Sequence, residues 1–116
     1  MKIGNKEYGF KLTVGASVQI AKLCPDGDLS RIEEAIGKNY AQQAEAMATI
    51  IVALNHGYAA AEEFEGRKAN RLKVEDVLSL SPELYSEVSA EAFRAFGADI
   101  RGEIEVESSK KAEAEG

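Results

Sequence analysis

The chain has 116 residues, of which 45% are hydrophobic and 29% are charged, so it has the size of one domain and the composition of a globular protein. Its 14 basic and 20 acidic residues give a formal net charge of −6, which argues against nucleic-acid binding, because that activity depends on neutralising phosphates. A single cysteine excludes an internal disulfide and a zinc site made of several cysteines.

Residues 1–13 predict a β-hairpin. Apolar and polar residues alternate on both sides of Gly4-Asn5, a pair that suits a two-residue turn. The alternating apolar residues are Met1, Ile3, Tyr8, Phe10 and Leu12. Because an isolated hairpin is marginal in water, we expect it to lie on the helices or to pair with another chain through its open edge.

Two short helices are predicted next, over residues 14–23 and 29–36, with the turn sequence PDGD between them. Thr13 is suited to cap the first helix and Asp28 the second, because their side-chain oxygens accept hydrogen bonds from N–H groups of the first turn. Pro25 ends the first helix and Gly37 the second. The apolar residues predicted to lie inward are Val14, Val18, Ile20, Ala21 and Leu23, followed by Leu29, Ile32 and Ile36.

The longest predicted helix covers residues 39–65, with Asn39 as its N-cap and Gly66 at its end. At about 1.5 Å per residue it would be a rod of roughly 40 Å. Its apolar stripe consists of Tyr40, Ala44, Met47, Ile51, Leu54, Tyr58 and Ala61. Ile50, Val52 and Ala53 lie off this stripe, so the middle of the helix is apolar nearly all round. We interpret it as the central helix of the domain; the alternative is that one side meets a partner.

The rest of the chain predicts a polar loop at residues 66–73, a short helix at 74–80 and a last helix that begins at the typical start sequence Ser81-Pro82-Glu83. The buried side of the last helix is predicted to be Leu84, Tyr85, Val88, Phe93 and Phe96. The predicted fold is therefore α+β and mainly α, with an N-terminal hairpin and about five helices in one domain of residues 1–97. Residues 98–116 are predicted to be a disordered acidic tail, with a possible edge strand at 102–107.

Residues with catalytic potential are few. Cys24 and His56 are the one thiol and the one imidazole, and we interpret the first as a small buried residue and the second as partly solvated. Asp26-Gly27-Asp28 resembles the start of a calcium loop, but the twelfth position of that loop holds no glutamate. The glutamates at the end of the long helix have no histidine at metal-binding spacing and predict a solvated face. We therefore predict no catalytic residue, no metal and no cofactor.

The basic loop at residues 67–73, followed by two helices, suggests a helix-turn-helix as one alternative. The last helix, however, carries Glu83, Glu87 and Glu91 beside one basic residue, Arg94. Carboxylates on that helix would repel DNA, so a small DNA-binding or regulatory protein is the weaker interpretation. The sequence has no apolar stretch long enough for a membrane span, and its start, MKIGNKEYGF, predicts no signal peptide.

The run KLTVGASVQIAKLCPDGDLSRIEEAIG at residues 11–37 resembles the N-terminal region of tail assembly chaperones of long-tailed phages and prophages of Gram-positive bacteria. The likeness covers residues 8–97, through LNHGY in the long helix and VEDVLSLSPELYSEVSAEAFRAF at 74–96. Its most distinctive part is LCPDGDL. These are core and turn residues, not a chemical signature.

The resemblance implies a protein that is not an enzyme. Such chaperones bind the tape measure protein, a long helical polypeptide that sets tail length, keep it soluble and help to recruit the tail tube protein. They act in the host cytoplasm, are not found in the mature virion, and are often also made in a longer, frameshifted form; self-association fits the family. A structural phage protein that stays in the virion, such as a connector or tail component, is the main alternative.

For this chain we accordingly expect protein partners, with no nucleic acid and no membrane. The candidate contact residues come from the predicted hairpin edge and from the long helix. They are Tyr8, Phe10, Leu12, Ile50, Ile51, Leu54 and Tyr58.

Overall fold

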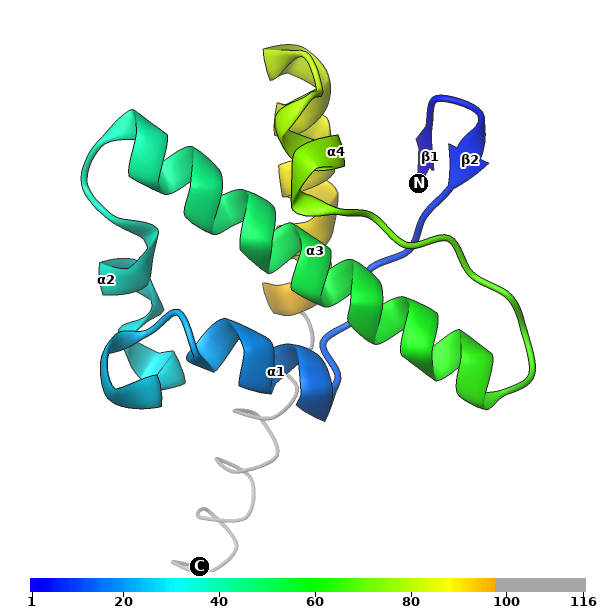
Figure 1. Cartoon of the computed structure of the whole chain (residues 1–116), viewed down its shortest axis with the longest axis horizontal. Coiled ribbons are helices and arrows are strands. Elements are labelled where there is room, and N and C mark those ends of the chain that lie inside the picture. Colours follow the sequence, from blue (N-terminus) through cyan, green and yellow to red (C-terminus); the bar gives the residue numbers. More distant parts are fainter. Residues whose placement is uncertain (98–116) are drawn as a thin grey trace, which may run out of the picture.

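The computed structural model describes residues 1–97. Within these residues a short hairpin is followed by five helices, so the prediction of a mainly helical α+β fold around one long helix is confirmed (Figure 1). The tail and the edge strand predicted at 98–116 lie outside the described residues.

The hairpin is confirmed, but it is shorter than predicted. β1 (Lys2–Ile3) pairs antiparallel with β2 (Lys6–Glu7). The turn between them needs a glycine, because Gly4 has a φ of +64°. The Tyr8 amide still donates to the Met1 carbonyl at 2.7 Å. Residues 9–13 then leave the hairpin and run along the long helix, where the Lys11 amide donates to the Leu54 carbonyl at 3.0 Å. The predicted alternation thus comes from contact with a helical core and not from a second long strand.

The first helix, α1 (Val14–Ala21), begins as predicted but faces the other way. The Thr13 hydroxyl accepts from the Ala16 amide at 3.1 Å. The buried side chains are Ala16 and Ile20, while Val14 is 82% exposed and Val18 47% exposed. The prediction that Val14 and Val18 lie inward is therefore wrong. The small side chain of Ala16 lets α1 approach the long helix closely, which a valine row would not allow.

The turn after α1 is confirmed in detail. Pro25–Gly27 forms a single 3₁₀ turn, η1, and the Asp28 carboxylate accepts from the Ser30 amide at 3.0 Å. The Ser30 hydroxyl donates to the same carboxylate at 2.7 Å, and this bond together with the one from the amide lowers the pKa of Asp28. A second 3₁₀ turn, η2 (Leu29–Arg31), leads directly into α2 (Ile32–Ile36), which places the predicted residues Leu29, Ile32 and Ile36 against the core.

The long helix, α3 (Tyr40–Phe64), is central: it crosses the molecule diagonally, with α1 below it and the last helix behind it (Figure 1). Its buried residues are Ala48, Ile50, Ile51, Ala53, Leu54, Asn55, Gly57 and Ala59. These lie on most sides of the helix, which supports its interpretation as the central helix. Only the middle of the predicted stripe is core, since Tyr40 at its start is 80% exposed.

The last helix covers residues 82–97 and follows the short helix α4 (Val74–Leu78). Its start is confirmed, because the Ser81 hydroxyl accepts from the Leu84 amide at 3.2 Å. The Tyr85 hydroxyl donates to the Ala44 carbonyl of α3 at 3.1 Å. The core that α3 shares with its neighbours consists of Ile20, Ala48, Ile50, Ile51, Ala53, Leu54, Leu72, Val77, Val88 and Ala92.

The cap of α3 supplies a first test. The Asn39 side-chain oxygen accepts from the Gln42 amide at 2.9 Å. Asn39→Ala is expected to lower the free energy of unfolding by about 1 kcal/mol, because that amide loses its partner. Asn39→Asp retains the acceptor and should stay close to the wild type. Urea unfolding followed by circular dichroism measures both, and equal losses in the two variants would contradict the cap.

Candidate functional site

A buried asparagine joins three segments at the centre of the molecule. Asn55 of α3 is fully buried. Its amide nitrogen donates to the Gly9 carbonyl at 3.1 Å and to the Asn70 carbonyl at 3.4 Å. Its oxygen accepts from the Leu72 amide at 2.7 Å. The side chain is thus satisfied at both ends, and it fixes the N-terminal segment and the loop at 65–73 to the same point of α3.

Two neighbours extend this arrangement. The His56 Nε2 lies 2.7 Å from the Leu72 carbonyl; since a carbonyl only accepts, Nε2 carries the proton and donates. The Asn70 amide donates to the Glu7 carbonyl at 3.0 Å, which ties the loop to the hairpin. We call Asn55, His56 and Asn70 the polar junction. His56 is half-buried, and its contact is a structural one.

A glycine permits the close crossing beside the polar junction. A Cβ atom at Gly57 would lie 2.6 Å from the Lys11 carbonyl oxygen and 2.9 Å from the Thr13 hydroxyl. A Cβ atom at Gly9 would likewise lie 2.5 Å from the ring of Tyr58. The N-terminal segment therefore passes directly over the backbone of α3, and it leads into α1 from there.

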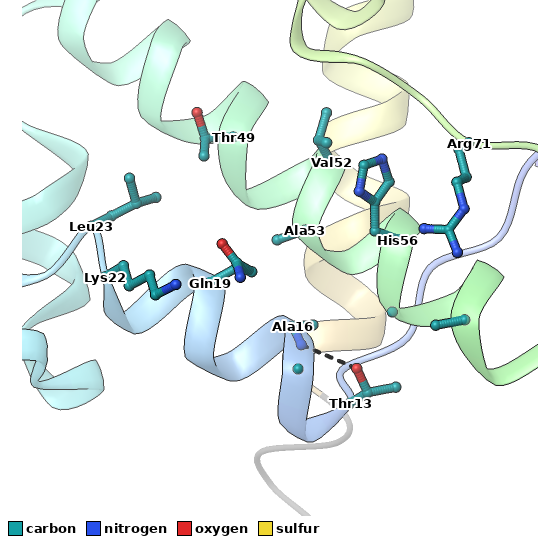
Figure 2. Close-up of a pocket in the computed structure, with 13 residues that line it drawn as sticks. Thr13, Ala16, Gln19, Lys22, Leu23, Thr49, Val52, Ala53, His56 and Arg71 are labelled. Carbon is teal, nitrogen blue, oxygen red and sulfur yellow. Dashed lines mark hydrogen bonds between the residues drawn. The ribbon is translucent and has the colours of Figure 1, made fainter.

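An open groove of about 500 Å³ lies between α1 and α3 (Figure 2). It is lined by Thr13, Gly15, Ala16, Gln19, Lys22, Leu23, Thr49, Val52, Ala53, His56, Gly57, Ala60 and Arg71. We call it the α1–α3 groove. Its surface is mainly apolar, and it opens to solvent. Figure 2 shows Ala53 of α3 and Gln19 of α1 pointing toward one another, with Leu23 just beyond the end of α1.

The titratable side chains that line the groove are all basic ones. Lys22, His56 and Arg71 line it, and no carboxylate among the described residues does so. Lys22 is exposed and makes no ion pair with a described residue, whereas Arg71 pairs with Glu63 at 2.8 Å. Lys22 thus gives this apolar groove a positive charge that no described carboxylate pairs, on a chain that is acidic overall.

Two glutamates at the end of α3 are paired with arginines of the following loop. Arg67 binds Glu62 and Arg71 binds Glu63. In each pair the hydrogen bond from the guanidinium lowers the pKa of the carboxyl group. The predicted solvated face is therefore a pair of surface ion pairs that hold the loop against the helix end.

These pairs make a pH-dependent prediction. Because the folded pKa of Glu63 lies below its ordinary value of 4.5, the pair contributes stability above that pH and loses its contribution as the pH falls. Arg71→Gln should raise the pKa of Glu63 toward 4.5 and leave that of Glu62 unchanged. Arg67→Gln is the matched control and should act on Glu62 alone. NMR titration of the side-chain carboxyl carbons measures the pKa of each glutamate in each variant. If either substitution changed both pKa values, the two ion pairs would not be independent, contrary to this prediction.

The cysteine is placed as an inert core residue. Cys24 is buried, and its Sγ donates to the Ile20 carbonyl at 3.5 Å. Burial, and then the nearby Asp28 carboxylate, raise the pKa of the Cys24 thiol. The thiol form that this favours is the less nucleophilic one. Within residues 1–97, no group of three or more His, Cys, Asp or Glu side chains is placed to hold a metal ion.

The predicted contact residues are not brought together on one surface. Ile50, Ile51 and Leu54 are fully buried in the core, so a partner has no access to them in the folded chain, and this part of the predicted surface is corrected. The hairpin-side residues Tyr8, Phe10 and Leu12 are half-buried and pack against the core, and Tyr58 is half-buried beside Gly9. The most apolar part of α3 instead holds the domain together.

The α1–α3 groove was missed by sequence reasoning. Val52 had one signal, its place off the apolar stripe, but nothing local marked Gln19 or Lys22 as its neighbours.

In the described part of the chain, no helix is long and apolar enough to cross a membrane. Compared with protein-family models, with curated proteins and with solved structures, the chain matches none.

Proposed function

We propose that this protein is a tail assembly chaperone, which binds the tape measure protein of a long-tailed phage or prophage in the host cytoplasm and keeps it soluble. The sequence likeness over residues 8–97 supports the proposal. In this function the protein also helps to recruit the tail tube protein and then leaves, so that it is not part of the mature virion.

The structural observation that carries the proposal is the outward apolar side of α1. Val14 and Val18 are one helical turn apart, and they are 82% and 47% exposed. Large apolar side chains that gather on one exposed element favour contact with another protein. A chaperone of an aggregation-prone helical protein needs such a surface.

The proposed mechanism is binding without chemistry. Many copies cover one long client, and each copy buries a short apolar stretch of it. Single contacts are weak, but contacts repeated along one chain raise the effective affinity by orders of magnitude. Docking of tail tube subunits then displaces the chaperone by competition.

Co-expression tests this function. The gene for the large helical protein expected beside this gene is expressed with and without this chain, and the soluble fraction of its product is measured. We expect the product to be soluble only in the presence of this chain. An equally insoluble product in both cultures would overturn the proposal.

Mass spectrometry of purified virions addresses the main alternative. A chaperone is expected to be missing from the particle, whereas a connector or tail component is present in stoichiometric amount. Binding to a labelled DNA duplex at low salt, lost steeply as salt is added, would instead favour the DNA-binding alternative.

A further inference from the structure

We propose that the α1–α3 groove binds an amphipathic helical segment of a partner protein, in which the apolar residues are flanked by aspartate or glutamate. The identification of that partner as the tape measure protein rests on the proposed function. The groove, the size of the ligand and its charge are argued from this structure alone.

The apolar part of the ligand follows from the surface of the groove. The apolar side chains in its lining are Ala16, Leu23, Val52, Ala53 and Ala60. Val18, one turn before Lys22 on α1, adds an exposed apolar side chain next to the lining residues. Burying these side chains under a partner is favourable by about 25 cal/mol for each Å² of apolar surface removed from water.

The helical form of the ligand follows from the dimensions. The lining residues of α3 extend from Thr49 to Ala60, which is about 16 Å at 1.5 Å per residue. This length matches about three turns of a helix lying along the groove. A helix presents anchors at positions i, i+3, i+4 and i+7, the arrangement by which amphipathic helices bind apolar grooves.

The acidic flank follows from the charge. Every charged or titratable residue in the lining is Lys22, His56 or Arg71. The whole chain has a net charge of −6, so its overall field would favour a basic partner, and the groove is a local exception. Lys22 has no ion pair with a described residue and is therefore free to meet a carboxylate of the partner.

Two synthetic peptides test the groove directly. Both are helices with leucine at i, i+3, i+4 and i+7; one has glutamate and the other lysine at the flanking positions. On titration into the full chain, the glutamate peptide is expected to shift the amide NMR signals of Gln19, Val52 and Ala60. The lysine peptide should bind at least about ten-fold more weakly. Equal binding of both, or shifts confined to other surfaces, would overturn the proposal.

Variants with matched controls separate the groove from the rest of the surface. Ala60→Glu places a long, negative side chain in the groove, whereas Ala41→Glu makes the same change on an exposed turn of α3 outside it. We expect Ala60→Glu to weaken binding of the glutamate peptide at least about ten-fold and Ala41→Glu to leave it unchanged. Thermal unfolding of both variants checks that each is folded.

A second pair tests the charge. Lys22→Glu should weaken binding of the glutamate peptide about five-fold or more, and the effect should shrink as salt is added. Lys38→Glu changes another exposed lysine, one that does not line the groove, and is expected to have no such effect. Equal effects of the two variants would show that only the net charge matters and would overturn the acidic flank.

The co-expression assay distinguishes failure of this inference from failure of the proposed function. If the wild type and Ala60→Glu keep the tape measure protein equally soluble, the groove is not the client site, although the function stands. If the wild type itself fails, the function falls, and the peptide titration alone judges the groove. Two other occupants of the groove would overturn the proposal of a separate partner protein. A second copy of this chain would be detected as a dimer in sedimentation that Ala60→Glu dissociates. Residues 102–107 of this chain would be detected if their mutation shifts the NMR signals of the groove.

Discussion

Asn55→Leu is expected to lower the free energy of unfolding by about 3 kcal/mol or more. The asparagine makes three hydrogen bonds to backbone groups that are 46, 15 and 17 residues away in the chain. Leucine has the same branched arrangement of heavy atoms and leaves no cavity, so the loss comes from the unpaired backbone groups and from its bulkier methyl groups. The Leu72 amide is the most costly of these, because the residue is buried and the short bond of 2.7 Å to Asn55 has no replacement.

The matched control for Asn55 is its exposed neighbour in the polar junction. Asn70→Ala removes one hydrogen bond, to the Glu7 carbonyl, at a site that water reaches, and about 1 kcal/mol or less is expected. Urea unfolding gives both free energies. Hydrogen exchange at the Leu72 amide should become faster in Asn55→Leu and stay near the wild-type rate in Asn70→Ala. Equal losses of stability in the two variants would contradict the central role of the buried asparagine.

Gly57→Ala is expected to destabilise the fold by about 2 kcal/mol, although alanine favours a helix over glycine by about 1 kcal/mol. The added Cβ would lie 2.6 Å from the Lys11 carbonyl oxygen, which is backbone and cannot rotate away. The Lys11 amide is bonded to the Leu54 carbonyl, so the segment cannot shift without breaking that bond. The crossing of the N-terminal segment over α3 must therefore open.

The same glycine-to-alanine substitution in α1 is expected to raise the stability of the fold instead of lowering it. A Cβ at Gly15 has the Thr13 hydroxyl as its nearest neighbour, at 3.9 Å, so Gly15→Ala meets no obstacle. It should stabilise the chain by up to about 1 kcal/mol through helix propensity. Thermal unfolding of both variants compares them. A stabilising Gly57→Ala would show that the crossing is looser than the structure has it.

Helix ends and turns were predictable because their causes are local. Thr13, Asp28, Asn39 and Ser81 each accept a hydrogen bond from an amide two or three residues later, as their positions in the sequence predict. Gly66 has a φ of +81° and ends α3, again as predicted. Such features need no information from distant parts of the chain, so one sequence is sufficient to locate them.

Which side of α1 faces the core was not predictable in this way. Its sequence, VGASVQIA, has apolar or small residues on most sides, so periodicity does not select one face. Contact with α3 selects the face of Ala16 and Ile20, since the small Ala16 allows a close approach and Ile20 fills the core beside it. As a result, Val14 and Val18 face solvent, and the surface on which the proposed function depends appears only in three dimensions.

The sequence by itself determined the number and order of the elements, their caps and the central place of the long helix, because periodicity and capping act over a few residues. The tertiary structure alone decided the polar junction and the α1–α3 groove. Both join residues far apart in the chain: Asn55 to Gly9 and Leu72, and Lys22 to His56 and Arg71. Only the packing of α1 and of the loop at 65–73 against α3 brings these groups together. No local sequence pattern encodes contacts between residues so far apart in the chain.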